Sequence, residues 1–213
     1  MKTKKLASVP TIKRLPLYLQ IVENAHKEGK EFISGTIIAE ELELEPIQVR
    51  KDLAITGIVG RPRIGFPVAQ LITCIHEFLL WDKEHSAIVV GAGSLGSALM
   101  GYDELKKRGM RIQAAFDSDP AKIGRTINGV PVFAMNDIAQ EASRLGSELA
   151  ILTVPPDVAQ TVAEQLTSAG IYAIWNFTNT KLKLDEDIVV QREDLSSGYA
   201  MLSVRMKLRL NQT

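Results

Sequence analysis

Three closely spaced glycines are the first residues in this chain whose types and spacing indicate chemistry. They follow an apolar run in the stretch SAIVVGAGSLGSALMG, residues 86–101. Gly91 allows a tight turn, Gly93 lets a pyrophosphate approach the backbone, and Gly96 lets a helix pack closely on the strand. Free N–H groups at the start of the next helix suit phosphate oxygens. The candidate dinucleotide-binding loop is therefore Gly91, Ala92, Gly93, Ser94, Leu95 and Gly96. The alternative is that the glycines only form a turn.

A carboxylate follows at the spacing that such a loop requires. Asp117 ends the apolar stretch RIQAAF, twenty-one residues after Gly96. It can accept hydrogen bonds from both hydroxyls of an adenosine ribose, and it repels a 2′-phosphate. No arginine stands directly at that position to compensate the charge. The sequence therefore predicts binding of NAD(H) in preference to NADP(H).

Groups that could use the nucleotide for catalysis are few. All three histidines, His26, His76 and His85, precede the glycine loop. Tyr102 and Lys181 could move protons, but a single Tyr or Lys more often serves packing or the surface. Strands and helices take up the rest of the nucleotide region, so no substrate domain remains. We expect a protein that binds and senses the nucleotide and is not an enzyme. A NAD-dependent oxidoreductase and a small CoA-binding protein are the alternatives.

The first third of the chain carries a pattern typical of DNA binding. IIAEELELEPIQVRKDL predicts a helix, a tight turn and a second helix that begins at Pro46. Val49 and Leu53 are expected to face inward, leaving Gln48, Arg50, Lys51 and Asp52 on the outer side. Gln, Arg and Lys suit base edges in the major groove. A solvated helix face is the alternative.

A basic hairpin is expected to follow that helix. ITGIVGRPRIGF predicts two short strands around Gly60-Arg61-Pro62-Arg63. Arg61 and Arg63 at the tip of such a wing could enter a minor groove, where the potential is most negative. Lys13 and Arg14 add positive charge near the N-terminus.

The hydrophobic pattern divides the chain into three parts. Helical spacing of apolar residues predicts a first helix that begins near Pro16, with one face formed by Leu15, Tyr18, Leu19, Val22 and Ala25. The same kind of spacing predicts a connecting helix over residues 67–81. Strands near 86–90, 111–116, 131–133, 148–153, 171–175 and 188–190 alternate with helices near 94–107, 136–145 and 157–169. This alternation predicts an α/β fold with a doubly wound parallel Rossmann sheet behind an N-terminal winged helix-turn-helix. We expect domains at 1–81 and 82–192, and a C-terminal dimerisation helix within 193–213.

Composition narrows the class further. Lys+Arg and Asp+Glu both number 25 among the 213 residues, yet residues 1–66 hold 11 basic against 8 acidic side chains. The single Cys74 fits a reducing compartment and a core position. No apolar run reaches the length of a membrane span and no signal core is present at the start, so we expect a cytoplasmic protein without membrane or metal partners.

At this point several motifs together resemble one family. VPTIKRLPLYL, QVRKDL with a Gly-punctuated wing, VVGAGSLGSAL, AAFDSDPAKIG, LTVP and NF stand in the order typical of the Rex redox-sensing transcriptional repressors, from about residue 9 to 204. The resemblance implies a homodimer that binds a palindromic operator and releases it when NADH binds. It also adds residues of those motifs to the expected nucleotide site, namely Tyr102, Lys122, Thr153, Val154, Pro155, Asn176 and Phe177.

Two regions depart from the family pattern. In the family, the first helix commonly carries an arginine that pairs with a carboxylate at the start of the last helix. That carboxylate matches Asp194, and the tyrosine with which it alternates near the nicotinamide matches Tyr102. The position of the arginine is occupied by Gln20 in this chain. Ala54-Ile55-Thr56-Gly57-Ile58 stands where Ser-Tyr-Phe-Gly-Glu is usual, and Arg63 where glycine is usual. These departures leave open a different operator, and a different or weakened nucleotide response.

The last helix carries an apolar seam of Leu195, Tyr199, Leu202 and Met206. Arg205, Lys207 and Arg209 are expected on its opposite face and end. The resemblance implies that this helix inserts into the partner subunit, where Asp194 would lie near Gln20 and the nicotinamide. Packing on its own sheet is the alternative.

Overall fold

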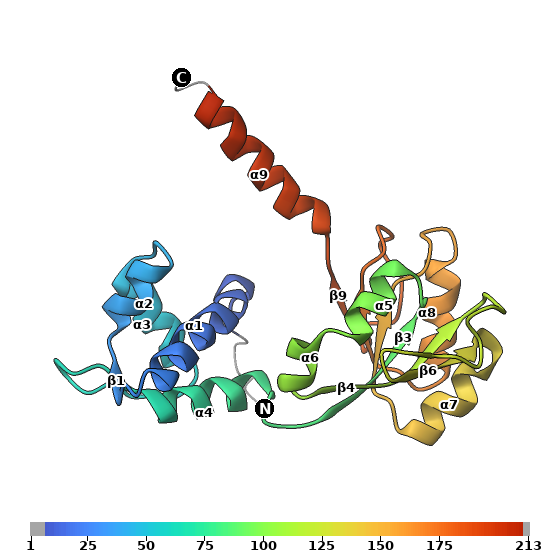
Figure 1. Cartoon of the computed structure of the whole chain (residues 1–213), viewed down its shortest axis with the longest axis horizontal. Helices are drawn as coiled ribbons and strands as arrows, with labels where there is room; N and C mark the ends of the chain where they lie inside the picture. The colour runs from blue at the N-terminus through green and yellow to red at the C-terminus, as the bar shows by residue number, and fades with distance from the viewer. Residues whose placement is uncertain (1–6, 211–213) are drawn as a thin grey trace. The chain divides into compact units, whose positions relative to one another are not determined.

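The computed structural model describes residues 7–210 and divides into two compact units, Met1–Lys83 and Glu84–Thr213. Figure 1 colours the first unit from blue to green and the second from green to red. Each unit has its own hydrophobic core, so each is described by itself.

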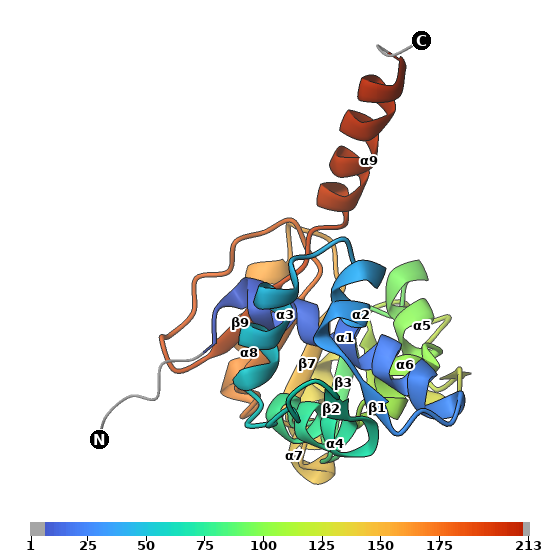
Figure 2. The ribbon, with the colours of Figure 1, turned by 90° about the vertical axis from the view of Figure 1, so that its left-hand side faces the viewer.

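The N-terminal unit is a helix-turn-helix with a short antiparallel sheet. Its helices are α1 (Val9–Lys27), α2 (Gly35–Glu41), α3 (Pro46–Ala54) and α4 (Val68–Leu79). Strand β1 (Phe32–Ile33) pairs with β2 (Phe66–Pro67). The hydroxyl of Ser34 caps α2 by accepting a hydrogen bond from the Ile37 N–H at 3.2 Å. Figure 2 turns this unit toward the viewer and shows α2 and α3 side by side. The expected helix, turn and helix that starts at Pro46 are confirmed.

Helix α1 begins seven residues before the position expected from its proline, so that expectation is wrong. Ser8 caps the helix, and Pro16 lies inside it. An interior proline costs about 3 kcal/mol because it removes one hydrogen bond and crowds the preceding turn. Two features offset this cost: Thr11 and Leu15 are buried ahead of the proline, and three side chains of α1 bond to a carboxylate on α3. Tertiary contacts therefore override the local signal.

The hairpin after α3 also differs from the expected pair of strands. Only an isolated bridge joins Arg61 to Gly65, with the turn Pro62-Arg63-Ile64 between them. Gly65 has a φ of 113°, and a Cβ there would lie 2.4 Å from the carbonyl oxygen of Ile33. The wing is thus a tight turn, and Gly65 holds its end close to the backbone of β1.

The C-terminal unit is a doubly wound, seven-stranded sheet of order β5-β6-β4-β3-β7-β8-β9. The strands are β3 (His85–Val90), β4 (Met110–Asp117), β5 (Thr126–Ile127), β6 (Val130–Ala134), β7 (Leu149–Leu152), β8 (Ala173–Asn176) and β9 (Val189–Arg192). All pairs are parallel except β5 with β6. The chain winds outward from β3 in one direction and then in the other, so the strand order reverses between β3 and β7. Ligands bind at such switch points in this class of sheet.

Both faces of this sheet are covered. Helices α7 (Ile138–Leu145) and α8 (Ala159–Ser168) pack on one face against Ile88, Val90 and Phe116. Helix α5 (Ser94–Met100) covers the other face, against Val89, Ala115 and Ile151. Coverage of both faces explains why these strands read as continuous apolar runs.

The expected helix over 94–107 is two helices. α5 ends at Gly101, and α6 (Asp103–Lys107) starts after Tyr102. The amide nitrogen of Asn128 donates to the carbonyl of Ser97 at 2.8 Å and lies 2.8 Å from where a Cβ on Gly101 would stand. Asn128 belongs to the β5–β6 turn, an element that the sequence pattern did not predict.

Helix α9 (Leu195–Leu210), red in Figure 1, exposes apolar side chains around most of its surface. The expected seam is present, with Tyr199 72 % and Leu202 55 % exposed. At about 100° per residue, a second apolar stripe of Met201, Val204 and Leu208 lies opposite, and these side chains are 57–62 % exposed. The expectation of a basic opposite face is therefore wrong, because Arg205 and Lys207 lie between the two stripes. No helix within residues 7–210 is long and apolar enough to cross a membrane.

Candidate functional sites

A buried carboxylate fixes the second helix of the helix-turn-helix. Asp52 on α3 is 2 % exposed. Arg14 binds it with two hydrogen bonds, Nε to Oδ2 at 2.6 Å and Nη2 to Oδ1 at 3.1 Å. The hydroxyls of Thr11 and Tyr18 and the amide of Gln48 add bonds of 2.9, 2.7 and 2.9 Å. Helices α1 and α3 are therefore joined through one saturated anion.

These contacts change the acidity of the buried groups. Burial alone raises the pKa of the Asp52 carboxyl, but hydrogen bonds from Arg14 and the other donors outweigh it and hold that pKa below its usual value. Burial and the bond to Asp52 raise the pKa of Tyr18 to about 12. Asp52 is thus ionised and Tyr18 protonated at neutral pH, which is the charge state that the network requires.

The same contacts revise which residues of α3 face outward. The expectation that Asp52 lies on the outer side is wrong, because four donors draw it into the interior. Gln48 is half-buried and bonds to Asp52, as does Arg14. Any contact of these two side chains with DNA stays a prediction. The exposed side chains of α3 are Ile47, Arg50, Lys51 and Ala54, which share one face of the helix.

A groove of about 710 Å³ runs between this helix and the wing. Arg50 and Ala54 line it from α3, and Arg61 and Arg63 line it from the turn. The guanidinium carbon of Arg61 lies 5.0 Å from the centre of the Phe32 ring, a cation–π contact that positions it. Lys13 is exposed on α1. The groove therefore gathers three of the predicted DNA-binding arginines.

Arg63 occupies a strained backbone position at the wing tip. Its φ is 62°, in the left-handed region, which costs a residue with a Cβ about 1–2 kcal/mol. Glycine would adopt this conformation without that cost. The arginine therefore adds a positive charge to the wing at the expense of backbone strain.

In the C-terminal unit, the glycine loop closes on the switch point of the sheet. The Thr153 hydroxyl after β7 donates to the carbonyl of Gly91 at 2.7 Å. A Cβ on Gly91 would lie 2.8 Å from the Thr153 carbonyl oxygen, and one on Gly96 would lie 2.0 Å from the carbonyl oxygen of Gly91. The packing of the loop itself thus requires two of its three glycines.

Gly93 is different, because the protein does not explain it. Its φ of −77° and ψ of −167° are open to any residue. A Cβ there would meet no protein atom within 4 Å, and the residue lines a pocket of about 690 Å³. The missing side chain leaves bare backbone facing this pocket. Such a cradle fits a group that must approach the main chain closely, as a pyrophosphate does.

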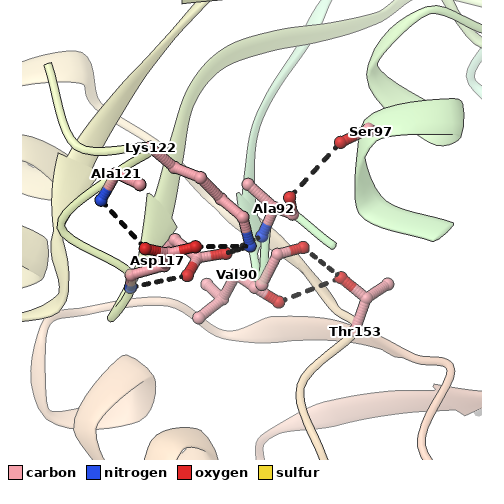
Figure 3. A network of polar contacts seen from close by, with 9 residues as sticks. Val90, Ala92, Ser97, Asp117, Ala121, Lys122 and Thr153 are labelled. Atoms are coloured by element: carbon pink, nitrogen blue, oxygen red, sulfur yellow. Dashed lines mark hydrogen bonds and ion pairs between the residues drawn. The ribbon is translucent and has the colours of Figure 1, made fainter. Parts of the chain in front are cut away.

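Asp117 lies beside the loop and is already bonded (Figure 3). It accepts hydrogen bonds from the N–H groups of Ala92 and Asp119, both at 2.8 Å, and from Lys122 Nζ at 3.0 Å. Burial raises the pKa of its carboxyl, but these donors together hold that pKa below its usual value. The sequence analysis found no arginine beside Asp117. The cation that bonds to Asp117 in the structure is Lys122, a residue expected in the same nucleotide site.

The pocket brings together seven of the expected nucleotide-binding residues, Gly91, Gly93, Asp117, Lys122, Thr153, Val154 and Pro155. It also contains Ser118, Asp119, Met135, Val158 and Val162, which the sequence analysis missed. Met135 directly follows β6, and Val158 lies in the connection between β7 and α8. Their position after strand ends was the available signal, but single apolar residues at helix starts resemble ordinary core.

The remaining expected residues lie outside this pocket. Ala92 contributes its N–H to Asp117, and Ser94 and Leu95 begin α5. Asn176 is 1 % exposed and bonds to Thr178 and Thr180, so it holds the turn after β8. The Phe177 ring packs against the Trp175 ring, with centroids 4.9 Å apart and the planes tilted by 49°, and Tyr102 is 56 % exposed before α6. Their contact with a nucleotide stays a prediction.

Of the expected switch residues Gln20 and Asp194, only Asp194 makes side-chain hydrogen bonds that the structure describes. Gln20 is exposed on α1. Asp194 Oδ1 accepts hydrogen bonds from Ser196 N at 2.9 Å and Ser196 Oγ at 2.6 Å, at the start of α9. These bonds lower the pKa of the exposed Asp194 carboxyl. Within residues 7–210, no group of three or more His, Cys, Asp or Glu is placed to hold a metal ion.

A winged helix-turn-helix and a glycine-loop sheet in one chain define a class, namely DNA-binding regulators with a nucleotide-binding fold. Two family models match, the "Putative DNA-binding protein N-terminus" over residues 7–54 and the "CoA binding domain" over residues 82–180.

The relatives agree with this class. A redox-sensing transcriptional repressor Rex of Treponema denticola is 54 % identical over 98 % of this chain and 100 % of its own. The Rex-family repressor RSP has been solved with β-NAD⁺ and operator DNA, with a TM-score of 0.88, 31 % identity and coverage of 98 % and 97 % of the two chains. Its complex with β-NADH gives the same TM-score and identity over 98 % and 99 %. The chain belongs to the Rex family of redox-sensing transcriptional repressors.

We predict that Asp52→Asn destabilises the protein by about 3 kcal/mol, because it leaves Arg14 without its buried partner. The folded pKa of Asp52 lies below the unfolded value of about 3.9, so its contribution is full above that pH and is lost as pH falls through the folded pKa. Urea unfolding followed by circular dichroism should show the gap between wild type and variant narrowing below about pH 4. Asp82→Asn, at an exposed site, is the control. Equal effects of the two variants would contradict the prediction.

Proposed function

We propose that this chain represses transcription by binding a palindromic operator as a homodimer and releases the DNA when NADH binds. The observation that carries the nucleotide half of the proposal is Gly93, whose bare backbone lines a pocket that the fold alone does not explain. The solved complexes of RSP, one with β-NAD⁺ and operator DNA and one with β-NADH, support the same assignment. An intracellular site of action in the cytoplasm follows from access to the chromosome.

In this proposal the pocket holds the adenosine half of the dinucleotide. The pyrophosphate would lie over Gly93, and the ribose hydroxyls would bond to Asp117. Met135, Val158 and Val162 supply the apolar wall that an adenine ring needs. Tyr102 and Phe177 would meet the nicotinamide half.

The DNA half rests on the exposed face of α3 and on the wing. Arg50 and Lys51 project from α3 and suit the major groove, while Arg61 and Arg63 suit the adjacent minor groove. The groove between helix and wing would follow one sugar–phosphate strand. Because Arg14 and Gln48 bond to Asp52, we assign them to holding α3 in place.

The dimer in this proposal is built by α9. A helix that is apolar on two opposite faces is stable when it is covered on both. Insertion into a partner subunit provides two surfaces at once, and a two-fold dimer matches a palindrome. Gln20, Tyr102 and Asp194 would couple the sites, although a Gln–Asp contact lacks the charged pairing that an arginine provides.

The proposal is tested by fluorescence anisotropy on a palindromic operator obtained by selection from random DNA. Titration with NADH, NAD⁺ and NADPH should show release by NADH well before release by the other two. Tight operator binding that no dinucleotide alters would retain the DNA-binding half and reject the sensing half. Oxidation of NADH by a keto acid or an aldehyde, which would take up the hydride, would instead favour an oxidoreductase.

We predict that the protein binds NADH at least about tenfold more tightly than NADPH, a difference of about 1.4 kcal/mol. Asp117 repels a 2′-phosphate, and Lys122 at 3.0 Å partly offsets that charge. Asp117→Ala should therefore narrow the ratio and Lys122→Met should widen it, as measured by calorimetric titration. Equal affinities of the wild type for both dinucleotides would remove Asp117 from the site.

We predict that Arg63→Gly weakens operator binding without lowering thermal stability. The variant loses one positive charge at the proposed DNA surface, so the slope of log affinity against log salt should fall by about one. It also relieves the left-handed strain at φ 62°. Arg63→Ala is the matched control, since it removes the charge and keeps the strain. Both should show the reduced slope, and the glycine variant should melt higher. Unchanged slopes would place Arg63 away from DNA.

We predict that Leu202→Glu and Val204→Glu each produce monomers that fail to bind the operator. The two residues lie on opposite apolar stripes of α9, and burial of either glutamate would be costly. Lys207→Glu, between the stripes, should remain dimeric. Light scattering measures the mass. If only one stripe were sensitive, α9 would be packed on a single surface and not inserted between two.

A further inference from the structure

One exposed residue of α3 has no structural task in its own unit. Ile47 is 60 % exposed, while Val49 and Leu53 of the same helix are fully buried and supply its core contacts. Burying an isoleucine side chain is worth about 1.5–3 kcal/mol, and this residue leaves most of that unused. A single exposed apolar residue is common on protein surfaces, so a role for Ile47 has to be argued from the side chains around it.

Those neighbours are two exposed cations on the same face. Arg50 and Lys51 stand three and four residues after Ile47, which places the three side chains together on the surface of α3. A protein partner that covered Ile47 would also have to desolvate both charges, which is costly. A polyanion attracts them instead. The mixed face therefore suits nucleic acid better than an apolar protein surface.

The saturated carboxylate then decides which groups remain to read bases. Gln48 Nε2 donates to Asp52 Oδ1 at 2.9 Å, so this amide is not free to bind an adenine with both of its atoms. Arg50 and Lys51 suit guanine or phosphate. Ile47 cannot form hydrogen bonds with its side chain. The apolar group that the major groove offers is the C5-methyl of thymine.

We propose that Ile47 is a specificity residue that contacts a thymine methyl in each operator half-site, next to the base pair read by Arg50. As the second residue of α3, it lies in the part of a recognition helix that contacts base edges. This inference rests on the proposed operator binding. It adds recognition of an A·T pair that no hydrogen-bonding side chain on the exposed face of α3 supplies.

The experiment replaces thymines of the operator one at a time with deoxyuridine, which keeps base pairing and removes only the methyl group. Wild-type affinity should fall about fourfold for one position in one half-site, and about fifteenfold when both half-sites carry it, as loss of one buried methyl each predicts. Ile47→Ala should bind the unmodified operator about as weakly as the wild type binds the doubly substituted one, and should not distinguish thymine from deoxyuridine at that position.

Ile37→Ala is the matched control, because Ile37 is 43 % exposed on α2 in the same unit. It should keep the full response to deoxyuridine. If every substituted operator bound the wild type normally, or if Ile47→Ala kept the same response, the inference would be overturned while operator binding stood. Absence of salt-dependent binding to any selected operator would instead reject the proposed function itself.

Discussion

A carboxylate removed from water must be given donors, and each unit of this chain is organised around one such group. Asp52 receives hydrogen bonds from four side chains and ties α1 to α3. Asp117 receives two main-chain N–H groups and Lys122, and it fixes the glycine loop against β4. An ion left unpaired in either place would cost several kcal/mol. Both networks therefore demand one arrangement of the elements around them, and that arrangement sets the functional surfaces.

The hydrogen bonds to Asp52 leave fewer polar side chains on the outer face of α3. Arg14 and Gln48 are types that read or neutralise DNA, yet both bond inward. What remains outside is a mixed face of Ile47, Arg50, Lys51 and Ala54. A similar exchange occurs at the proposed ribose site, where Lys122 would partly offset the charge by which Asp117 would exclude a 2′-phosphate. In both units the group that stabilises the fold would, under the proposed function, also affect the selectivity of the adjoining surface.

Much of this could be predicted from the sequence, because local spacing carries it. Apolar periodicity located the strands of the doubly wound sheet, and the turn before Pro46 located α3. Long-range contacts account for what was missed. From local spacing alone, Asp52 is predicted to be a surface residue. Its burial depends on donors that are distant in sequence, such as Thr11, forty-one positions earlier. The start of α1 ahead of Pro16 depends on the same contacts. The break after α5 depends on Asn128, from a turn thirty-one residues beyond Ser97.

Helix α9 shows how an interface can be inferred from one chain alone. A surface helix needs one apolar stripe, and a second opposite stripe has no use on a helix that packs on one side only. Along α9, Arg205 and Lys207 lie between the two apolar stripes, and Arg209 lies near the end of the helix. The proposed insertion of α9 into a partner subunit would give this helix a covering surface on each side. In the proposed homodimer each chain would help to cover α9 of the other, and the two-fold axis would place one copy of α3 on each half of a palindromic operator.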